Sequence, residues 1–434
     1  MSLKETLKKI PGLQPLVKGV KALFCDLGVL PAFLAERKIN RGDGPIRVGF
    51  ICQYIPSWVK LQPIYEMMCS DSRFEPILLC VPSGIENGVL TEVSGSNDTL
   101  DYFLSRGYKE AVNTLQPDGS WLPLEPLNLS YVFYPRPYNT YMPTCYQSHK
   151  VYRHSKICLI LYGMNVTQEV VRITLNRDFF RYVCYYFAEL PYPCLQNKRN
   201  GWLLHKLGLQ KSLYFGIPGV ETIRAAKALP CPAWDFAGEG SFRVMWTPRW
   251  TTDLALGGSN FFTFYEFLLE LAKKDPGYAF LFRPHPLAID HFLETGELTQ
   301  QQAADFLQQC NTLPNVELDK EKEYSATFWG ADVLISDISG IIPEYFATGK
   351  PLIFCAGNMH LTLEQTTAKM IEASYVVYTA QELEKCLADL KQGIDPKANL
   401  RQQILNKYFG EENSRPNKRI LEQLAASHKT TSPT

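Results

Sequence analysis

The chain has 434 residues, which exceeds one ordinary domain and fits two domains of about 150–200 residues each. Its hydrophobic content of 46% and charged content of 20% are ordinary for a globular protein in water. The 44 basic and 44 acidic side chains give a formal net charge of zero, which argues against a nucleic-acid partner.

The cysteine pattern excludes several further classes. The twelve cysteines are scattered, with no CxxC pair and no repeated spacing, so neither a zinc site nor a secreted disulfide framework is expected. No run of about 18 apolar residues predicts a transmembrane helix, and no signal-peptide pattern opens the chain. We therefore expect a cytoplasmic protein with reduced thiols and no metal ion.

Residues 1–40 are expected to form an amphipathic segment. From Leu3 to Leu27 apolar residues recur at helical spacing, interrupted by two prolines that predict a kink or break. The interleaved basic residues are Lys4, Lys8, Lys9, Lys18 and Lys21. The pattern fits a helix on an anionic membrane, here the inner face of the plasma membrane. It fits equally well a helix packed on the protein's own surface.

Residues 45–228 have the alternation of strands and helices that is typical of a parallel sheet. Residues 46–51 predict a buried strand, 61–69 a helix and 76–81 a second strand. Compact apolar runs at 131–134 and 156–161 continue the series. Residues 179–194 are rich in Tyr, Phe and Cys, which predicts core or interdomain packing.

A Pro- and Gly-containing stretch, residues 227–240, predicts the domain junction. A second series of strands and helices follows over residues 240–410, and residues 411–434 predict a C-terminal helix and tail. We therefore expect an α/β protein with two Rossmann-like domains facing a cleft. In this class, ligands bind at the carboxyl ends of the strands.

The first candidate binding motif is Arg283-Pro284-His285-Pro286, directly after a predicted strand. Arg283 offers a planar fork for phosphate oxygens, and His285 can donate to a phosphate or transfer a proton. A turn histidine satisfied by the backbone is the competing interpretation.

The second motif leads from a buried strand through a turn of small residues into a helix. Its candidate ligand-binding residues are Ser336, Asp337, Ser339, Gly340 and Glu344. Backbone N–H groups at the helix start, with the Ser339 hydroxyl, suit a pyrophosphate, and Glu344 suits a ribose hydroxyl. Ser339 as a plain helix cap and Glu344 as a first-turn acid are the structural alternatives.

The third motif is Trp246-Thr247-Pro248-Arg249-Trp250, at the end of the first strand of this half. Thr247 and Arg249 would add a hydroxyl and a cation to the same strand edge. The two tryptophans are equally expected in the core.

Together these motifs, with Gly349-Lys350-Pro351 and the apolar run after it, resemble the CDP-glycerol glycerophosphotransferases of teichoic-acid synthesis. The resemblance covers residues 243–356 and, more thinly, 131–138 and 161–163. It implies a GT-B fold with an N-terminal acceptor domain and a C-terminal nucleotide-donor domain. It also implies membrane-surface attachment. The implied reaction moves glycerol phosphate or ribitol phosphate from a CDP donor to a hydroxyl of a glycan or lipid-linked acceptor and releases CMP, with no cofactor.

The resemblance implies that Arg283 and His285 bind the donor phosphates. It also implies that Ser339 and the turn beside it bind these phosphates from the opposite side. Two positions depart from the family. Its Trp-His-Gly motif, whose histidine is the favoured base, corresponds here to Leu161-Tyr162-Gly163, and its paired serines are here Ser339 and Gly340. Tyrosine, with an ordinary pKa of about 10, is a poor base at neutral pH. Tyr162 could instead orient the acceptor, or His149 or His154 could supply the base.

Two other functions remain open from the sequence: a GT-B glycosyltransferase that uses a nucleotide sugar, and a non-catalytic nucleotide-binding subunit of a cell-envelope or capsule-polysaccharide assembly. The acceptor, the polyol, single addition against polymerisation, and the oligomeric state are not determined by the sequence.

Overall fold

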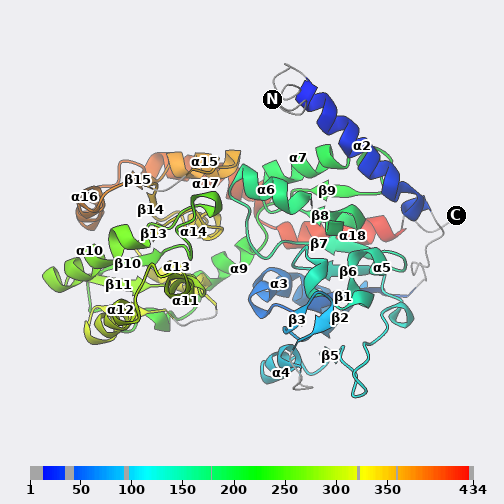
Figure 1. Cartoon of the computed structure of the whole chain (residues 1–434), viewed down its shortest axis with the longest axis horizontal. Coiled ribbons are helices and arrows are strands. Elements are labelled where there is room, and N and C mark those ends of the chain that lie inside the picture. Colours follow the sequence, from blue (N-terminus) through cyan, green and yellow to red (C-terminus); the bar gives the residue numbers. More distant parts are fainter. Residues whose placement is uncertain are drawn as a thin grey trace. The chain divides into compact units, whose positions relative to one another are not determined.

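The computed structural model describes residues 13–34, 44–91, 97–176, 178–319, 323–357 and 360–429. The chain folds into two compact units (Figure 1). Unit 1 comprises residues 1–162, 171–218 and 415–434, and unit 2 comprises residues 163–170 and 219–414. Each unit is built on one large parallel sheet, which confirms the expected α/β class.

Unit 1 contains a seven-stranded sheet in the order β5-β2-β1-β6-β7-β8-β9, and all its neighbouring strands are parallel. The strands are β1 (Ile46–Cys52), β2 (Phe74–Cys80), β5 (Val112–Asn113), β6 (Tyr131–Tyr134), β7 (Lys156–Leu159), β8 (Val183–Phe187) and β9 (Lys211–Leu213). A short hairpin, β3 (Ile85–Glu86) and β4 (Val89–Leu90), stands apart from it. The aromatic run that predicted only packing contains the fully buried strand β8.

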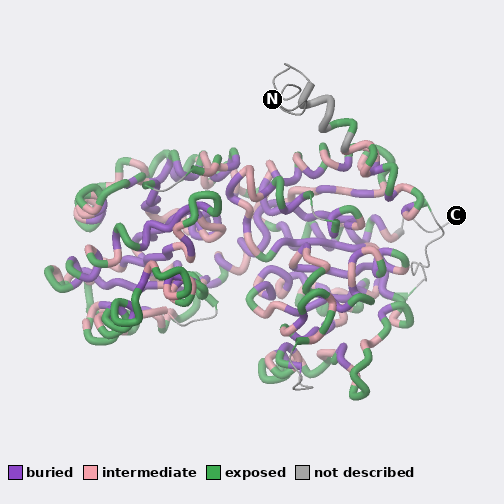
Figure 2. The backbone as a smooth tube through the Cα atoms, viewed as in Figure 1, coloured by how far each residue is buried: buried purple, intermediate pink, exposed green. Residues whose placement is uncertain are grey.

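The helices of unit 1 cover a core that is buried on both faces of the sheet (Figure 2). They are α2 (Leu13–Leu34), α3 (Trp58–Cys69), α4 (Asp98–Ser105), α5 (Ser148–Val151), α7 (Pro191–Asn200), α8 (Trp202–Lys206) and α18 (Pro416–Lys429); α6 (Gln168–Leu175) crosses the unit boundary. Strands buried on both faces explain why the sequence shows continuous apolar runs here rather than alternation.

Helix α2 packs on unit 1 with one face and exposes apolar side chains on the other. Val29 and Phe33 join the core, and the buried Asp26 carboxylate accepts the backbone N–H of Leu203 at 2.9 Å. Val20, Phe24, Leu27 and Leu34 are 45%, 69%, 45% and 68% exposed. These four residues recur at helical spacing and form what we call the α2 stripe. Lys4, Lys8 and Lys9 of the expected segment lie outside the described residues.

Helix α18 brings the end of the chain back to unit 1, where Figure 1 shows it in red among the blue and cyan elements. Ile420, Leu421 and Leu424 are buried in the unit 1 core. The Tyr131 hydroxyl donates to the Leu424 carbonyl at 2.9 Å. Residues 411–434 were expected to form a C-terminal helix and tail, and the structure packs helix α18 into unit 1.

Unit 2 contains a six-stranded parallel sheet in the order β12-β11-β10-β13-β14-β15. The strands are β10 (Phe242–Thr247), β11 (Tyr278–Phe282), β12 (Val316–Leu318), β13 (Val333–Ser336), β14 (Leu352–Cys355) and β15 (Tyr375–Val377). The three predicted binding motifs follow β11, β13 and β10, and β10 lies between β11 and β13 in the sheet. Their carboxyl ends therefore share one edge of the sheet.

The helices of unit 2 are α9 (Val220–Ala225), α10 (Phe261–Lys274), α11 (Ala288–Glu294), α12 (Gln300–Thr312), α13 (Ser325–Gly330), α14 (Ile341–Phe346), α15 (Gln365–Glu372), α16 (Ala380–Lys391) and α17 (Ala398–Phe409). Helix α10 shows why they form, because its buried residues Phe261, Phe264, Leu268 and Ala272 fall at helical spacing. Within the described ranges, no helix is long and apolar enough to cross a membrane.

Candidate active site

Thr247 and Ser336 join the two central strands of unit 2 at their carboxyl ends. They are paired in the β10–β13 register, and the Thr247 hydroxyl donates to Ser336 Oγ at 2.9 Å. The Ser336 hydroxyl in turn contacts the Asp337 carbonyl at 2.9 Å. Both residues are buried, at 7% and 0% exposure. Their hydroxyls therefore fix the sheet edge that carries the other candidate residues.

The Asp337 carboxylate is fully engaged by neighbouring donors. It accepts the backbone N–H of Arg249 at 2.8 Å and the Asn260 side-chain amide at 2.9 Å. The backbone N–H of Asn260 and the Ser259 hydroxyl approach it at 3.3 Å. Burial raises the pKa of Asp337, and these donors oppose that rise. Asp337 thus ties the end of β13 to the β10 loop and to the start of α10.

The Arg249 guanidinium lies over the turn that follows β13. Its Nη1 donates to the Ile338 carbonyl at 2.7 Å, while its buried Nε has no hydrogen-bond partner. Burial lowers the pKa of Arg249, and the charge of Asp337 opposes this effect. Gly257 leaves the space, because a Cβ there would lie 3.1 Å from Arg249 Nε and its φ is +110°. Arg249 is thus a partly buried cation beside the turn that follows β13.

Arg283 is held by two side chains that the sequence did not single out. Its Nη1 forms a 2.6 Å ion pair with the buried carboxylate of Asp319, and its guanidinium lies 5.0 Å from the centre of the Tyr324 ring. Only 20% of the Arg283 side chain is exposed. The fork is thereby fixed in one orientation beside the end of β11, which suits recognition of phosphate.

Glu344 is buried in α14, at 4% exposure, and its Oε2 accepts the Tyr324 hydroxyl at 2.5 Å. The same tyrosine ring stacks on Arg283. Glu344 is therefore linked to the Arg283 site through Tyr324, a link that its sequence position alone did not reveal. Its proposed contact with a ribose stays a prediction.

His285 is held as a neutral imidazole. Its pKa is lowered to about 4, first by desolvation of the partly exposed ring and second by the charge of Arg249. The backbone N–H of Leu287 donates to its Nδ1 at 3.2 Å, so the proton of the neutral ring resides on Nε2. Its ring centre lies 6.3 Å from that of Trp250. His285 can therefore donate one hydrogen bond to a phosphate oxygen near neutral pH.

Ser339 and Gly340 form the turn before α14, which has six residues. The Ser339 hydroxyl accepts the N–H of Ile341, and its carbonyl accepts the N–H of Ile342, both at 3.3 Å. Ser339 thus occupies two N–H groups that were expected to be open to pyrophosphate, although the N-cap of α14 itself is Gly340. A Cβ on Gly340 would lie 3.0 Å from the backbone N and O of Met164, which explains a glycine at this position.

Tyr162 belongs to unit 1, after strand β7, and is 37% exposed. Burial of its hydroxyl, together with Tyr138 and Tyr54, raises its pKa to about 12, against a lowering effect of Arg136. A phenol with this pKa is a weak general base at neutral pH. His154 lies two residues before β7 begins, at the amino edge of the sheet, and the His149 ring lies 6.3 Å from that of Tyr182.

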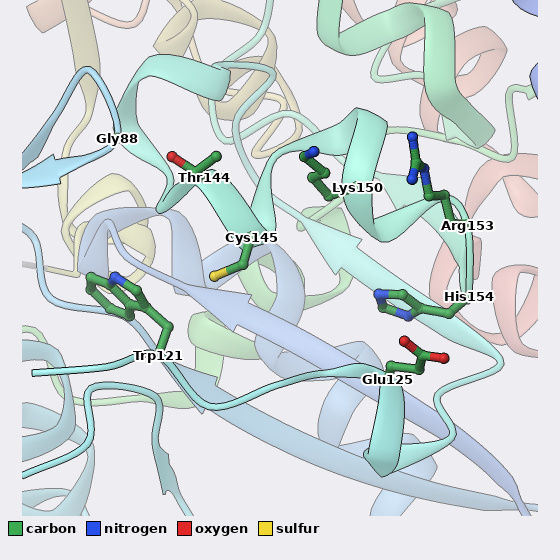
Figure 3. Close-up of a pocket in the computed structure, with 8 residues that line it drawn as sticks. All are labelled: Gly88, Trp121, Glu125, Thr144, Cys145, Lys150, Arg153 and His154. Atoms are coloured by element: carbon green, nitrogen blue, oxygen red, sulfur yellow. The ribbon is translucent and has the colours of Figure 1, made fainter. Parts of the chain in front are cut away.

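A separate cavity of about 770 Å³ in unit 1 contains His154 (Figure 3). Figure 3 shows the Glu125 carboxylate beside the His154 ring, with Lys150 and Arg153 extending from the α5 side and Trp121 on the opposite wall. Gly88, Thr144 and Cys145 complete its lining. None of the residues predicted to bind the donor lines this cavity.

Metal ligands were not expected from the sequence. Among the side chains that the structure describes, no group of three or more His, Cys, Asp and Glu is placed to hold a metal ion.

Known structures share this fold at low sequence identity. The UDP-GlcNAc 2-epimerase of Neisseria meningitidis, bound to UDP-GlcNAc, matches with a TM-score of 0.59 and 15% identity over 88% of this chain and 100% of that one. The wall teichoic acid polymerase TagF matches with a TM-score of 0.53 and 14% identity over 95% and 98%. These likenesses confirm the GT-B-like fold. Among curated proteins, none matches the chain in sequence.

Family resemblance is established separately, by sequence. Residues 238–426 match the model of the family described as CDP-Glycerol:Poly(glycerophosphate) glycerophosphotransferase. The match includes every candidate residue of unit 2, from Thr247 to Glu344. Residues 238–426, which are less than half of the chain, therefore carry the sequence pattern of this family, and this match supports a transferase of the CDP-glycerol glycerophosphotransferase type.

Proposed function

We propose that the chain transfers glycerol phosphate, or ribitol phosphate, from its CDP-activated form to a hydroxyl of a teichoic-acid-like polymer or a lipid-linked glycan. The acceptor oxygen attacks the phosphorus that carries the polyol. The bond from that phosphorus to the bridging oxygen breaks, CMP leaves with the bonding electrons, and the proton of the acceptor hydroxyl passes to a base.

The observation that carries the proposal is the pairing of Arg283 and His285 at the end of β11. Asp319 and Tyr324 fix the arginine fork, and the Leu287 N–H fixes the histidine tautomer. We propose that both residues bind the donor diphosphate. Preorganised donors of this kind stabilise charge that develops in the transition state.

We propose that Arg249 helps to stabilise the leaving CMP. Its buried Nε has a hydrogen still to donate, and its Nη1 is fixed on the Ile338 carbonyl. Asp337, Thr247 and Ser336 act through their neighbours, since each is buried within the network that holds the Arg249 loop. Ser339 and Gly340 shape the turn that faces the donor phosphates, and Glu344 orients the donor through Tyr324.

The tyrosine at position 162 favours a second candidate function. Because its phenol is a weak base, an acceptor that needs no histidine there is equally compatible, as in a glycosyltransferase that uses a UDP or GDP sugar. A non-catalytic nucleotide-binding subunit is the remaining alternative. In the leading proposal Tyr162 orients the acceptor.

We propose that the protein works on the cytoplasmic side of the membrane, attached through helix α2. The α2 stripe exposes Phe24 and Leu34 at 69% and 68%, while the other side of the helix packs into unit 1. The lysines of residues 1–21 provide the charge that an anionic lipid surface attracts.

Release of CMP from CDP-glycerol, measured with a glycerol-phosphate oligomer as acceptor, tests the function. The His285→Ala variant should lose turnover by at least about 100-fold, the scale of a missing transition-state donor. The His291→Ala variant is the matched control, because His291 also packs on Trp250 but follows the site in α11. Wild-type turnover in His285→Ala would refute the site.

A further inference from the structure

Four tyrosine rings surround one arginine in unit 1. The Arg136 guanidinium lies 4.8, 5.4, 4.6 and 5.8 Å from the ring centres of Tyr54, Tyr138, Tyr141 and Tyr162. The rings form two edge-to-face pairs, Tyr54 with Tyr162 at 5.5 Å and Tyr138 with Tyr141 at 5.7 Å. We call these five residues the Arg136 cluster.

The Arg136 cluster lies where a doubly wound sheet binds its ligands. Its members follow the carboxyl ends of β1, β6 and β7, which are adjacent parallel strands. The backbone N–H of Tyr162 donates to the Pro135 carbonyl at 2.9 Å, which fixes the β7 end beside Arg136. Pro135 and Pro137 restrict the backbone on both sides of the arginine. The cluster is thus positioned by three strand ends before any ligand arrives.

Arg136 has hydrogen-bonding capacity that the protein leaves unused. Its buried Nε has no partner, and its Nη1 makes one long contact of 3.4 Å with Gln53 Oε1. No ion pair in the described ranges involves Arg136. A half-buried guanidinium without a carboxylate lacks the countercharge that normally accompanies it. An anionic ligand would supply both the charge and the acceptors.

The tyrosines define the rest of the ligand. Tyr141 and Tyr162 are each 37% exposed, so part of the cluster's aromatic surface remains accessible around the cation. Tyrosine hydroxyls can donate to, and accept from, the hydroxyls of a polyol, and the rings pack against its carbon chain. A ligand that combines a phosphate with a short polyhydroxylated chain satisfies both parts of the cluster.

We propose that the Arg136 cluster is the acceptor subsite and binds a phosphate of the growing polyol-phosphate chain. The inference rests on the proposed function and assigns the residues of unit 1 that bind its acceptor. Arg136 engages a phosphodiester of the acceptor, and the tyrosines hold the adjoining polyol. In this arrangement Tyr162 is a binding residue, which accounts for a tyrosine where the related family carries its basic histidine.

The test is direct binding of a glycerol-phosphate trimer to the full-length protein without donor, measured by calorimetry. The Arg136→Gln variant should bind the trimer about 10- to 100-fold more weakly, as expected for lost charge-assisted hydrogen bonds. The Arg136→Lys variant, which keeps the charge but loses the fork, should fall between the two. In turnover assays, the Arg136→Gln defect should appear as a higher KM for the trimer.

Arg106→Gln is the matched control. Arg106 also lies over a tyrosine, Tyr102 at 5.4 Å, but it caps α4 on the exposed surface and should leave trimer binding unchanged. A thermal melt of each variant separates a folding defect from a binding defect. If Arg136→Gln is misfolded, the trimer affinity of Arg136→Lys is compared with that of wild type instead, and an unchanged affinity would contradict the proposed subsite.

Three outcomes would overturn the acceptor subsite: equal trimer affinity in wild type and Arg136→Gln, no trimer binding by wild type, or equal binding of a glycerol oligomer that lacks phosphate. Donor binding separates this failure from failure of the proposed function. If CDP-glycerol binds to unit 2 while the trimer affinity is the same in wild type and Arg136→Gln, only the proposed acceptor subsite is wrong. If CDP-glycerol does not bind to wild type, the function itself is wrong.

Discussion

The Asp337 carboxylate accepts the backbone N–H of Arg249 at 2.8 Å, and so couples the end of β13 to the loop that follows β10. The same carboxylate holds Asn260 at the start of α10. One buried acid thereby sets the position of the Arg249 guanidinium without itself being open to a ligand. Its role follows from geometry that spans almost 90 residues of sequence.

We predict that Asp337→Asn destabilises unit 2. The amide presents hydrogens where the carboxylate accepts them, so at least one of the donors from Arg249, Asn260 and Ser259 loses its partner in a buried position. The expected loss is about 1–3 kcal/mol of unfolding free energy, measured by denaturant titration. Donor affinity should fall as well, since the Arg249 loop is released. Unchanged stability and affinity would mean that this network is dispensable.

The substitution Gly340→Ser tests why the second serine of the related family is missing. Because a Cβ would lie 3.0 Å from the Met164 backbone, the added side chain should force a shift rather than restore a donor contact. We expect a loss of about 1–3 kcal/mol in a thermal or chemical melt, with no gain in CDP-glycerol affinity. A stable variant with tighter donor binding would contradict this explanation.

The low pKa of His285 gives a pH prediction. Its pKa falls from 6.5 to about 4, so the folded protein binds fewer protons than the unfolded chain between these values. The contribution of His285 to stability is therefore fully present above pH 6.5 and is lost as the pH falls toward 4. The NMR titration of the His285 ring, assigned with His285→Gln, should have its midpoint near pH 4. A midpoint near pH 6.5 would refute the proposal that His285 acts as a neutral hydrogen-bond donor.

The α2 stripe predicts binding to vesicles that contain anionic phosphatidylglycerol. Phe24→Asp should weaken binding at least about tenfold, because it removes an exposed apolar side chain and adds a negative charge. Ile173→Asp, at 61% exposure in α6, is the control and should bind as wild type does. Equal binding of wild type and Phe24→Asp would exclude the stripe. Deleting residues 1–38 is a poorer test, because it also removes the core residues Val29 and Phe33.

Most of the framework could be predicted because it is encoded locally. The runs 242–246, 278–282 and 333–336 are apolar, short and followed by turn residues, and all three are strands of one sheet. Their order places Thr247, Arg283 and Asp337 at a common edge, as the rule for parallel sheets predicts. The strand β8 was missed because a dense aromatic run fits core packing as well as a strand.

The partners of the candidate residues could not be predicted, because they come from distant or irregular segments. Asp319 follows Arg283 by 36 residues and meets it only because β12 pairs with β11. Tyr324 lies in a loop, and its two partners belong to different motifs. A signal for Asn260 was present, since Gly257-Gly258-Ser259-Asn260 directly precedes a strong amphipathic helix. The Arg136 cluster combines three strand ends, and no single stretch of sequence reveals it.

In the proposed function, unit 2 binds a CDP-polyol through Arg283 and His285. Calorimetric titration of the wild-type protein with CDP-glycerol, CDP-ribitol, CMP, UDP and GDP, and of His285→Ala with the best ligand, tests it most directly. We expect selective binding of the cytidine nucleotides and a large loss of affinity in His285→Ala. Preference for UDP or GDP, or CDP-glycerol binding that is unaffected by His285→Ala, would contradict it.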